Sequence, residues 1–132
     1  MYHTPIAFET LKGKTLIEIK VRRDSYISGH REQDKIVFVT SEYERYVMSH
    51  DQDCCENVDI ESIVGDMDDL IGSEILLAEM VQRDGEWDKH KYGSQTWTFY
   101  KLATLKGYVD IRWLGESNGY YSEAVDFYLE KE

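Results

Sequence analysis

The chain has 132 residues, of which 42% are hydrophobic and 13% aromatic, a composition typical of a folded domain. We expect one domain over residues 1–132. The formal net charge of -11 disfavours direct nucleic-acid binding, because proteins that bind phosphate backbones present basic surfaces. Neither a basic leader nor an apolar run of the roughly 20 residues needed to span a membrane occurs, so we expect a cytoplasmic protein without membrane contact.

The charge imbalance lies in the middle of the chain. Residues 41–90 contain 15 acidic and 3 basic residues, a net charge of -12, whereas the rest contains 11 acidic and 12 basic residues. Two interpretations stay open. The acidic surface keeps the protein soluble, or it attracts a basic protein or a cation.

The first half of the chain predicts strands. Residues 15–21 alternate as in a half-buried strand. One face of this strand would carry its branched side chains, Ile17, Ile19 and Val21. Residues 35–40 and 43–49 are rich in β-branched and aromatic side chains and are separated by two polar residues, so we expect a hairpin.

One short helix is expected near residues 66–71, because Asp66 is a candidate N-cap and Gly72 a candidate stop. Residues 73–83 combine weak alternation with good helix formers, so strand and helix both stay open. The run is short and is followed by a polar loop over residues 83–94, which favours a strand.

The last third of the chain contains three strand-like runs, at residues 96–103, 107–114 and 120–129, which predict an antiparallel meander. In the middle run, one face carries the apolar side chains Val109, Ile111 and Trp113. On the opposite face, charged residues are placed to form cross-strand pairs: Asp110 and Arg112 with Lys101, Glu123 or Asp126. The predicted fold class is mainly β (α+β), an antiparallel sheet or small barrel with this meander and one short helix.

Residues 49–61, SHDQDCCENVDIE, gather residue types that are common in reactive and metal sites. A structural zinc site uses ligand pairs separated by two or more residues, whereas Cys54 and Cys55 are adjacent, and the other histidines, His3, His30 and His90, are remote in sequence. A calcium loop that begins at Asp51 would place Glu56 where glycine makes the turn. Spacing therefore favours neither metal site.

The two cysteines are expected to be unreactive. Neighbouring carboxylates raise the pKa of a thiol, which disfavours a nucleophile. A disulfide between adjacent cysteines closes a strained small ring, so we expect two thiols, as in a reducing cytoplasm. Because free cysteines are usually buried, Cys54 or Cys55 would fill the core, while His50 and the aspartates cap a turn and the acids face outward.

No motif predicts an enzyme or a cofactor. The glycines form no phosphate-binding loop, and no pair of carboxylates is singled out by its spacing. Aromatic residues are concentrated in the last third, where core packing and an interface are both possible roles. The aromatic candidates for an interface are Tyr120, Tyr121 and Trp113.

Three segments carry a resemblance to a known family: FETLKGKTLIEI, HDQDCCENVDIESIVGDMDDLIGS and GSQTWTFYKLATLKGYVDIRWLGESNGYYSEAVDF. Together they resemble an uncharacterised family of short acidic proteins from bacteriophages and bacteria, a domain of unknown function. The resemblance implies a small intracellular protein, often from mobile elements, and it carries over no catalytic or binding residue.

The main functional hypothesis is a non-catalytic binding or inhibitor protein that engages a basic host or defence protein through an acidic face. The predicted face consists of eight carboxylates, Asp51, Asp53, Glu56, Asp59, Glu61, Asp66, Asp68 and Asp69. The alternative is a metal-binding or thiol-dependent module. Its residues would be His50, Asp51, Asp53, Cys54 and Cys55.

Overall fold

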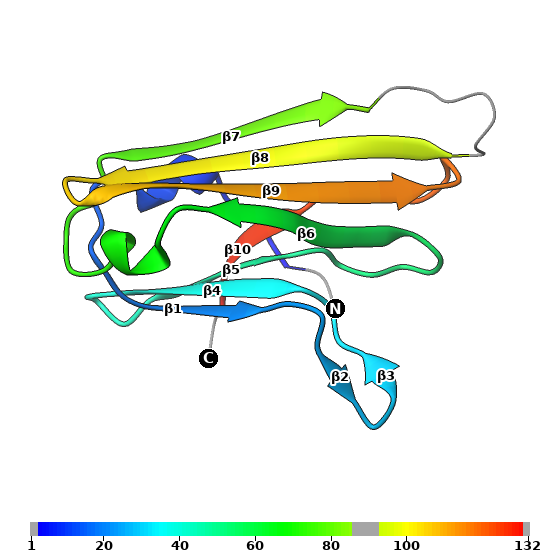
Figure 1. Ribbon diagram of the computed structural model, residues 1–132, viewed down its shortest axis with the longest axis horizontal. Helices are drawn as coiled ribbons and strands as arrows, with labels where there is room; N and C mark the ends of the chain where they lie inside the picture. The colour runs from blue at the N-terminus through cyan, green and yellow to red at the C-terminus, as the bar shows by residue number, and fades with distance from the viewer. Residues whose placement is uncertain (1–2, 86–92, 131–132) are drawn as a thin grey trace.

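Ten strands form two four-stranded antiparallel sheets and one small hairpin in the computed structural model, which describes residues 3–85 and 93–130. The two sheets lie face to face (Figure 1). None of the helical segments in these residues is long and apolar enough to cross a membrane.

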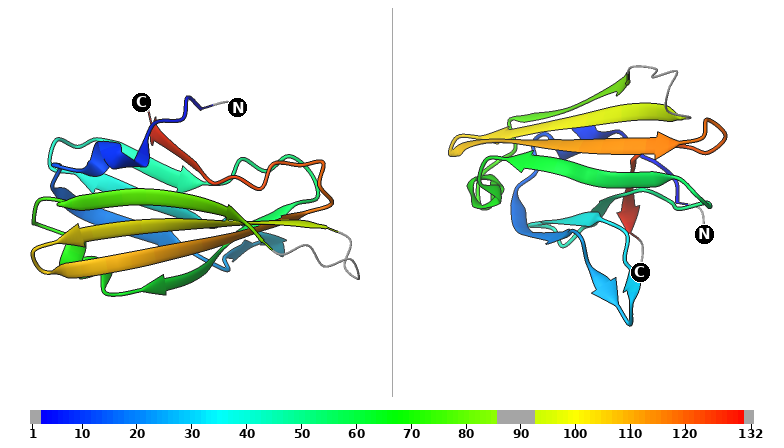
Figure 2. Two further views of the ribbon diagram at one scale, coloured as in Figure 1. Left: turned by 90° about the horizontal axis from the view of Figure 1, so that it is seen from above. Right: turned by 45° about the vertical axis from the view of Figure 1, so that its right-hand side comes forward.

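The first sheet has the strand order β1-β4-β5-β10. These strands are β1 (Leu16–Arg22), β4 (Lys35–Thr40), β5 (Arg45–Ser49) and β10 (Asp126–Glu130). Between β1 and β4, the short strands β2 (Tyr26–Ile27) and β3 (His30–Arg31) pair as a hairpin that projects beyond the sheets (Figure 2).

The second sheet has the order β6-β9-β8-β7. Its strands are β6 (Asn57–Val64), β7 (Leu77–Asp84), β8 (Ser94–Thr104) and β9 (Gly107–Ser117). Two 3-10 turns, η1 (Phe8–Leu11) and η2 (Met67–Leu70), lie outside the sheets in sequence. Leu11 of η1 and Leu70 of η2 are fully buried and close the core.

The core lies between the two sheets. Alternation along β9 turns Val109, Ile111 and Trp113 inward, as predicted, and all three are buried. Trp113 joins the sheets because its indole Nε1–H donates to the sulfur of Met48 on β5 at 3.2 Å. Burial of these side chains is the main stabilising contribution, since apolar area removed from water contributes about 25 cal/mol per Å².

Several predicted elements are confirmed. The hairpin of residues 35–40 and 43–49 is formed by β4 and β5, the first predicted strand is β1, and residues 73–83 contain β7 rather than a helix. The short helix near residues 66–71 is a 3-10 turn, capped by Asp66, whose carboxylate accepts the N–H of Asp68 at 2.9 Å. The described strands form open sheets, so the small barrel is wrong.

The predicted C-terminal meander is wrong in its third strand. Strands β8 and β9 pair as expected, but only Asp126–Glu130 is a strand, and it pairs with β5 in the other sheet. The connection between β9 and β10 contains the buried Glu123, whose carboxylate accepts hydrogen bonds from the hydroxyls of Ser94, Thr96 and Ser117. These bonds fold the chain over the end of β8 and β9, and the edge of β9 is taken by β6.

The predicted buried face of the first strand is only partly buried. Ile19 packs against the core, whereas Ile17 and Val21 are 45% and 42% exposed. Strand β1 is at the edge of its sheet, and its register shifts between Leu16 and Glu18. The bulge brings Leu16 rather than Ile17 into the core.

Candidate functional site

The loop that joins β5 to β6 has an arrangement opposite to the one expected. Cys54 and Cys55 are exposed and bonded to each other as a disulfide, so the expectation of two buried thiols is wrong. The buried residues of the loop are His50 and Glu56, which are 4% and 2% exposed. Glu56 therefore does not belong to an outward acidic face. Burial of a carboxylate is tolerated here because every oxygen has hydrogen-bond donors.

Glu56 is the centre of this loop. Its Oε2 accepts from His50 Nε2 at 2.7 Å and from the N–H of Asp53 at 2.9 Å, while its Oε1 accepts from the N–H of Cys54 at 2.9 Å. Burial alone would raise the pKa of Glu56, but the hydrogen bonds from Asp53, His50 and Cys54 lower it to about 2. The carboxylate is therefore ionised in the folded protein at neutral pH.

His50 is held between two acceptors. Its Nδ1 lies 2.7 Å from the carbonyl oxygen of Ala124, and its Nε2 lies 2.7 Å from Glu56. Each ring nitrogen of His50 therefore faces an oxygen that can accept a hydrogen bond. The contact of His50 with Glu56 fixes the loop against the segment that precedes β10.

Gln52 extends the network from the loop to the first sheet. Its Nε2 faces three acceptors, the carbonyl oxygens of Cys54 and Glu56 and Oε1 of Glu56, at 3.1, 2.8 and 3.2 Å. This fixes its amide orientation and turns its Oε1 toward Gln33, whose Nε2 donates at 2.7 Å. The remaining amide oxygen, Oε1 of Gln33, is buried and has no hydrogen-bond partner among the described residues.

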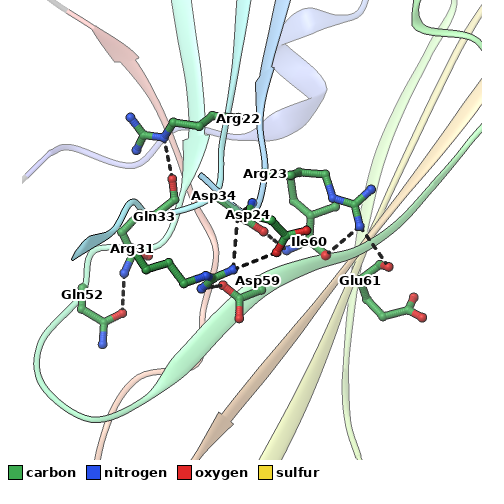
Figure 3. A network of polar contacts seen from close by, with 10 residues as sticks. All are labelled: Arg22, Arg23, Asp24, Arg31, Gln33, Asp34, Gln52, Asp59, Ile60 and Glu61. Carbon is green, nitrogen blue, oxygen red and sulfur yellow. Dashed lines mark hydrogen bonds and ion pairs between the residues drawn. The ribbon is translucent and has the colours of Figure 1, made fainter. Parts of the chain in front are cut away.

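The β2-β3 hairpin is tied to β6 by a second network, centred on Arg31 (Figure 3). Arg31 donates to Asp59 at 2.7 Å and lies 3.4 and 3.5 Å from Asp24 and Asp34. Asp34 is buried, and its carboxylate accepts the N–H of Ile60 at 2.9 Å. The hairpin therefore has a fixed position beside the loop that joins β5 to β6.

A pocket of about 150 Å³ opens between the hairpin and this loop. It is lined by eight residues, Arg31, Glu32, Gln33, Gln52, Glu56, Asn57, Val58 and Asp59. We call this end of the sandwich, formed by residues 23–34 and 50–59, the disulfide end. Polar side chains from segments distant in sequence converge here.

The predicted acidic face is divided. Asp51 and Asp53 are exposed at the disulfide end, and Asp66 and Asp68 are exposed beside η2, at the other end of β6 (Figure 1). The eight residues of β6 separate the two groups by about 25 Å, at 3.3 Å per residue. The predicted residues therefore do not form one contiguous surface.

The other predicted carboxylates are partly engaged. Asp59 pairs with Arg31, and Glu61 pairs with Arg112, which lowers the pKa of Glu61. Arg112 thus contacts β6 rather than any of the partners that we expected from the meander. Asp69 is half-buried beside Gly107. Asp59 and Glu61 are therefore engaged within the protein, by contacts to the β2-β3 hairpin and to β9.

The three predicted aromatic residues do not form one surface. Trp113 is fully buried, so its predicted role in an interface is wrong. Tyr120 is 89% exposed and Tyr121 is half-buried, both in the connection between β9 and β10. The outer face of the second sheet has a separate pocket of about 220 Å³. Its lining consists of Ser62, Val64, Phe99, Tyr100, Lys101, Asp110, Ile111 and Arg112.

The metal or thiol module is not supported by the geometry. No group of three or more His, Cys, Asp or Glu side chains that could hold a metal ion occurs within residues 3–85 and 93–130. The sulfurs of Cys54 and Cys55 are bonded to each other and provide no thiolate, and both nitrogens of His50 are engaged. His3 stacks on Tyr128, His30 is in the hairpin, and His90 lies outside the described residues, as does most of the polar loop 83–94.

Sequence reasoning missed Gln33, Gln52 and Arg31. These residues lie in a short hairpin and two connections, where no periodic pattern marks them. Their significance comes only from the pairing of segments that are 19 to 28 residues apart.

Comparison with known proteins identifies the family of the chain. No curated protein sequence and no solved structure matches it. A family model, described as Domain of unknown function (DUF7448), matches residues 9–127, which agrees with the resemblance to an uncharacterised family. The chain belongs to this family of domains of unknown function, DUF7448.

Proposed function

We propose that the protein is a non-catalytic binding domain whose disulfide end engages a basic partner protein. The resemblance to small phage and bacterial proteins makes a host or defence protein the kind of partner we propose, with the domain acting as its inhibitor in the cytoplasm. The observation that carries the proposal is the pair of exposed carboxylates, Asp51 and Asp53, on a fixed loop beside the pocket.

The carboxylates of Asp51 and Asp53 have no hydrogen-bond or ion-pair partner among the described residues, in contrast to Asp59 and Glu61. The loop that carries them is ordered by the Glu56 network before any partner arrives. Binding therefore costs little ordering entropy, which favours affinity. Exposed charges of one sign also accelerate association with a partner of opposite sign.

The acidic residues beside η2 are a weaker candidate for the same role. Asp66 caps η2, so one of its carboxylate oxygens already accepts the N–H of Asp68. The two ends offer a matched comparison, because each has two exposed aspartates that can be neutralised without changing side-chain size. Asp51→Asn/Asp53→Asn changes the disulfide end, and Asp66→Asn/Asp68→Asn keeps an N-cap residue at position 66.

A pull-down from bacterial lysate tests the proposal with the wild type and both double variants. We expect partners with basic surfaces that are captured at low salt, lost at high salt and lost with Asp51→Asn/Asp53→Asn. The Asp66→Asn/Asp68→Asn variant should retain them. Partners that are retained at high salt and by both variants would show that the disulfide end is not the binding surface.

A further inference from the structure

Strand β7 is the outermost strand of the second sheet (Figure 1). Residues 79–84 are all exposed, and within the described part of the chain their main-chain hydrogen bonds go only to β8. The register of β7 with β8 runs without a shift from Leu77 to Asp84. A straight, exposed edge of this kind presents a row of N–H and C=O groups that can pair with a strand of another chain.

The other edges of the two four-stranded sheets are covered or interrupted. Arg23 donates to the carbonyl oxygens of Ile60 and Glu61 on β6 at 3.2 and 3.3 Å. The N–H of Ile6 donates to Phe127 on β10 at 2.8 Å, and β1 contains a bulge. Such contacts and bulges prevent pairing between edges. Strand β7 has no bulge and no proline or lysine, so its edge is the one suited to pairing.

The hydrogen-bond pattern shows which main-chain groups of β7 face this edge. The N–H of Gly85 donates to the carbonyl oxygen of Gln95 on β8 at 2.8 Å. Bonded and unbonded pairs alternate along an antiparallel ladder, so the odd-numbered residues of β7 bond to β8. The even-numbered residues, with Met80 and Gln82 at the centre, direct their N–H and C=O groups to the open edge.

The charges of β7 are symmetric about Val81. Glu79 and Arg83 lie two residues before and after Val81, so all three share the outer face of the sheet. Both charged side chains are exposed and have no ion-pair partner among the described residues. If two β7 strands pair antiparallel with Val81 opposite Val81, each Glu79 faces Arg83 of the other copy. Opposite charges directly across two strands stabilise the pair.

The same register satisfies the main chain. It lets Met80 and Gln82 exchange hydrogen bonds with Gln82 and Met80 of the other copy, because the outward groups of both strands then oppose each other. A shift by one residue would set outward groups against groups already bonded to β8. A shift by two residues would separate Glu79 from Arg83.

From the open edge and its self-complementary charges we infer that β7 pairs antiparallel with β7 of a second copy of this chain, centred on Val81. The pairing joins two four-stranded sheets into one continuous sheet. It goes beyond the proposed function, because it uses a surface separate from the disulfide end. The disulfide end lies at the same end of the sheet as Asp84, so the antiparallel dimer directs its two disulfide ends in opposite directions.

Sedimentation equilibrium of the full chain from about 5 to 500 μM tests the inference. We expect a monomer–dimer equilibrium with a dissociation constant of about 10–100 μM, since an edge pairing is smaller than a standard interface and each copy has a net charge of -11. The variants Glu79→Arg and Arg83→Glu each set like charges opposite each other. Each should therefore weaken dimerisation at least about tenfold.

Combining the two reversals should restore the dimer. An equimolar mixture of Glu79→Arg and Arg83→Glu again has opposite charges at both contacts, as has the double variant Glu79→Arg/Arg83→Glu. Both samples should have a dissociation constant within about threefold of the wild type. The control Glu42→Arg reverses an exposed charge on the turn between β4 and β5 and should stay within about twofold.

Amide hydrogen exchange in the wild type tests the main-chain pairing without any substitution. Exchange at Met80 and Gln82 should slow at least about twofold between about 20 and 500 μM, because dimerisation covers their N–H groups. Exchange at Val81 should change less, because its N–H is bonded to β8 in the monomer. Equal slowing at all three residues would contradict pairing through this edge.

A monomer at every concentration overturns the inference and leaves the edge to an extended segment of another protein. A dimer that survives both single reversals, or mixed variants that fail to dimerise, also overturns it. The Asp51→Asn/Asp53→Asn variant should dimerise like the wild type, so loss of partner capture with an intact dimer concerns the proposed function alone. A monomer that still captures basic partners at low salt leaves the proposed function standing.

Discussion

Nε2 of His50 lies 2.7 Å from Oε2 of Glu56, and both side chains are buried. The second ring nitrogen of His50 faces the carbonyl oxygen of Ala124, so the buried His50 and Glu56 side chains connect the end of β5, the loop that joins β5 to β6 (the disulfide loop) and the segment before β10. The pair explains why Asp51 and Asp53 have fixed positions. They belong to a loop that wraps around the Glu56 carboxylate.

Replacement of Glu56 by Gln should lower the free energy of unfolding by about 2–4 kcal/mol, because it removes the charged acceptor of the hydrogen bonds from His50, Asp53 and Cys54. Urea unfolding at pH 7 measures the effect. The control Asp53→Asn changes an exposed carboxylate of the same loop and should stay within about 0.5 kcal/mol. Similar values for the two variants would show that the buried carboxylate does not stabilise the loop.

Stability should decline at acid pH in a way that depends on Glu56. The folded protein holds the pKa of Glu56 at about 2, below its ordinary value of 4.5, so the unfolded chain takes up the proton first. The contribution is complete above about pH 4.5 and is lost as the pH falls toward 2, by at most about 3 kcal/mol.

Urea unfolding of wild type and Glu56→Gln at several pH values between 6 and 2 isolates this contribution. The variant is needed for comparison because three other carboxylates also have lowered pKa values. These are Glu44, Glu61 and Glu130, which accept hydrogen bonds from Lys14, Arg112 and Arg45, respectively. The difference between the two proteins should shrink with acidification. A constant difference would contradict an ionised, buried Glu56.

Gly65 should tolerate no side chain. Its φ is +108°, and an added Cβ would lie 2.4 Å from the carbonyl oxygen of Tyr108 on β9. Gly65→Ala should therefore lower the free energy of unfolding by at least about 2 kcal/mol. Gly29, with φ +80° and open space around it, is the control, and Gly29→Ala should cost about 1 kcal/mol. Equal losses would argue against the close approach of β6 and β9.

The disulfide should contribute little to global stability. Cys54 and Cys55 are adjacent and exposed, so their bond closes almost no chain, and Cys54→Ser/Cys55→Ser should change the free energy of unfolding by less than about 1 kcal/mol. Thiol titration of the denatured protein without reductant should find no free thiols. Two titratable thiols, or a loss above about 2 kcal/mol, would restore the expectation of buried cysteines.

The strands were predictable where a single face of the sheet is buried. Val109, Ile111 and Trp113 alternate with exposed residues, and this period identified both the strand and its inward face. Residues 120–129 have a similar composition, but β6 occupies the edge of β9, and the buried Glu123 accepts hydrogen bonds from three hydroxyls of β8 and β9. A buried carboxylate of this kind leaves no periodic signal.

The burial pattern of the disulfide loop could not be predicted from the sequence, for a related reason. Residue type predicts buried cysteines and exposed acids, and the structure reverses both. Glu56 is buried because His50, six residues earlier, and two backbone N–H groups supply its hydrogen bonds. The pocket depends in addition on Gln33 and Arg31, which reach the loop only through tertiary pairing. Asp51 and Asp53 are exposed as expected, and their role in binding stays a prediction.

Selection from a library of random displayed peptides tests the central claim most directly, because it can be carried out before any partner has been identified. We predict that the immobilised protein enriches basic peptides, and that their affinity falls at least about tenfold with Asp51→Asn/Asp53→Asn but less than about twofold with Asp66→Asn/Asp68→Asn. Enriched peptides without basic residues, or equal losses with the two variants, would contradict the assignment of the disulfide end as a binding surface for basic partners.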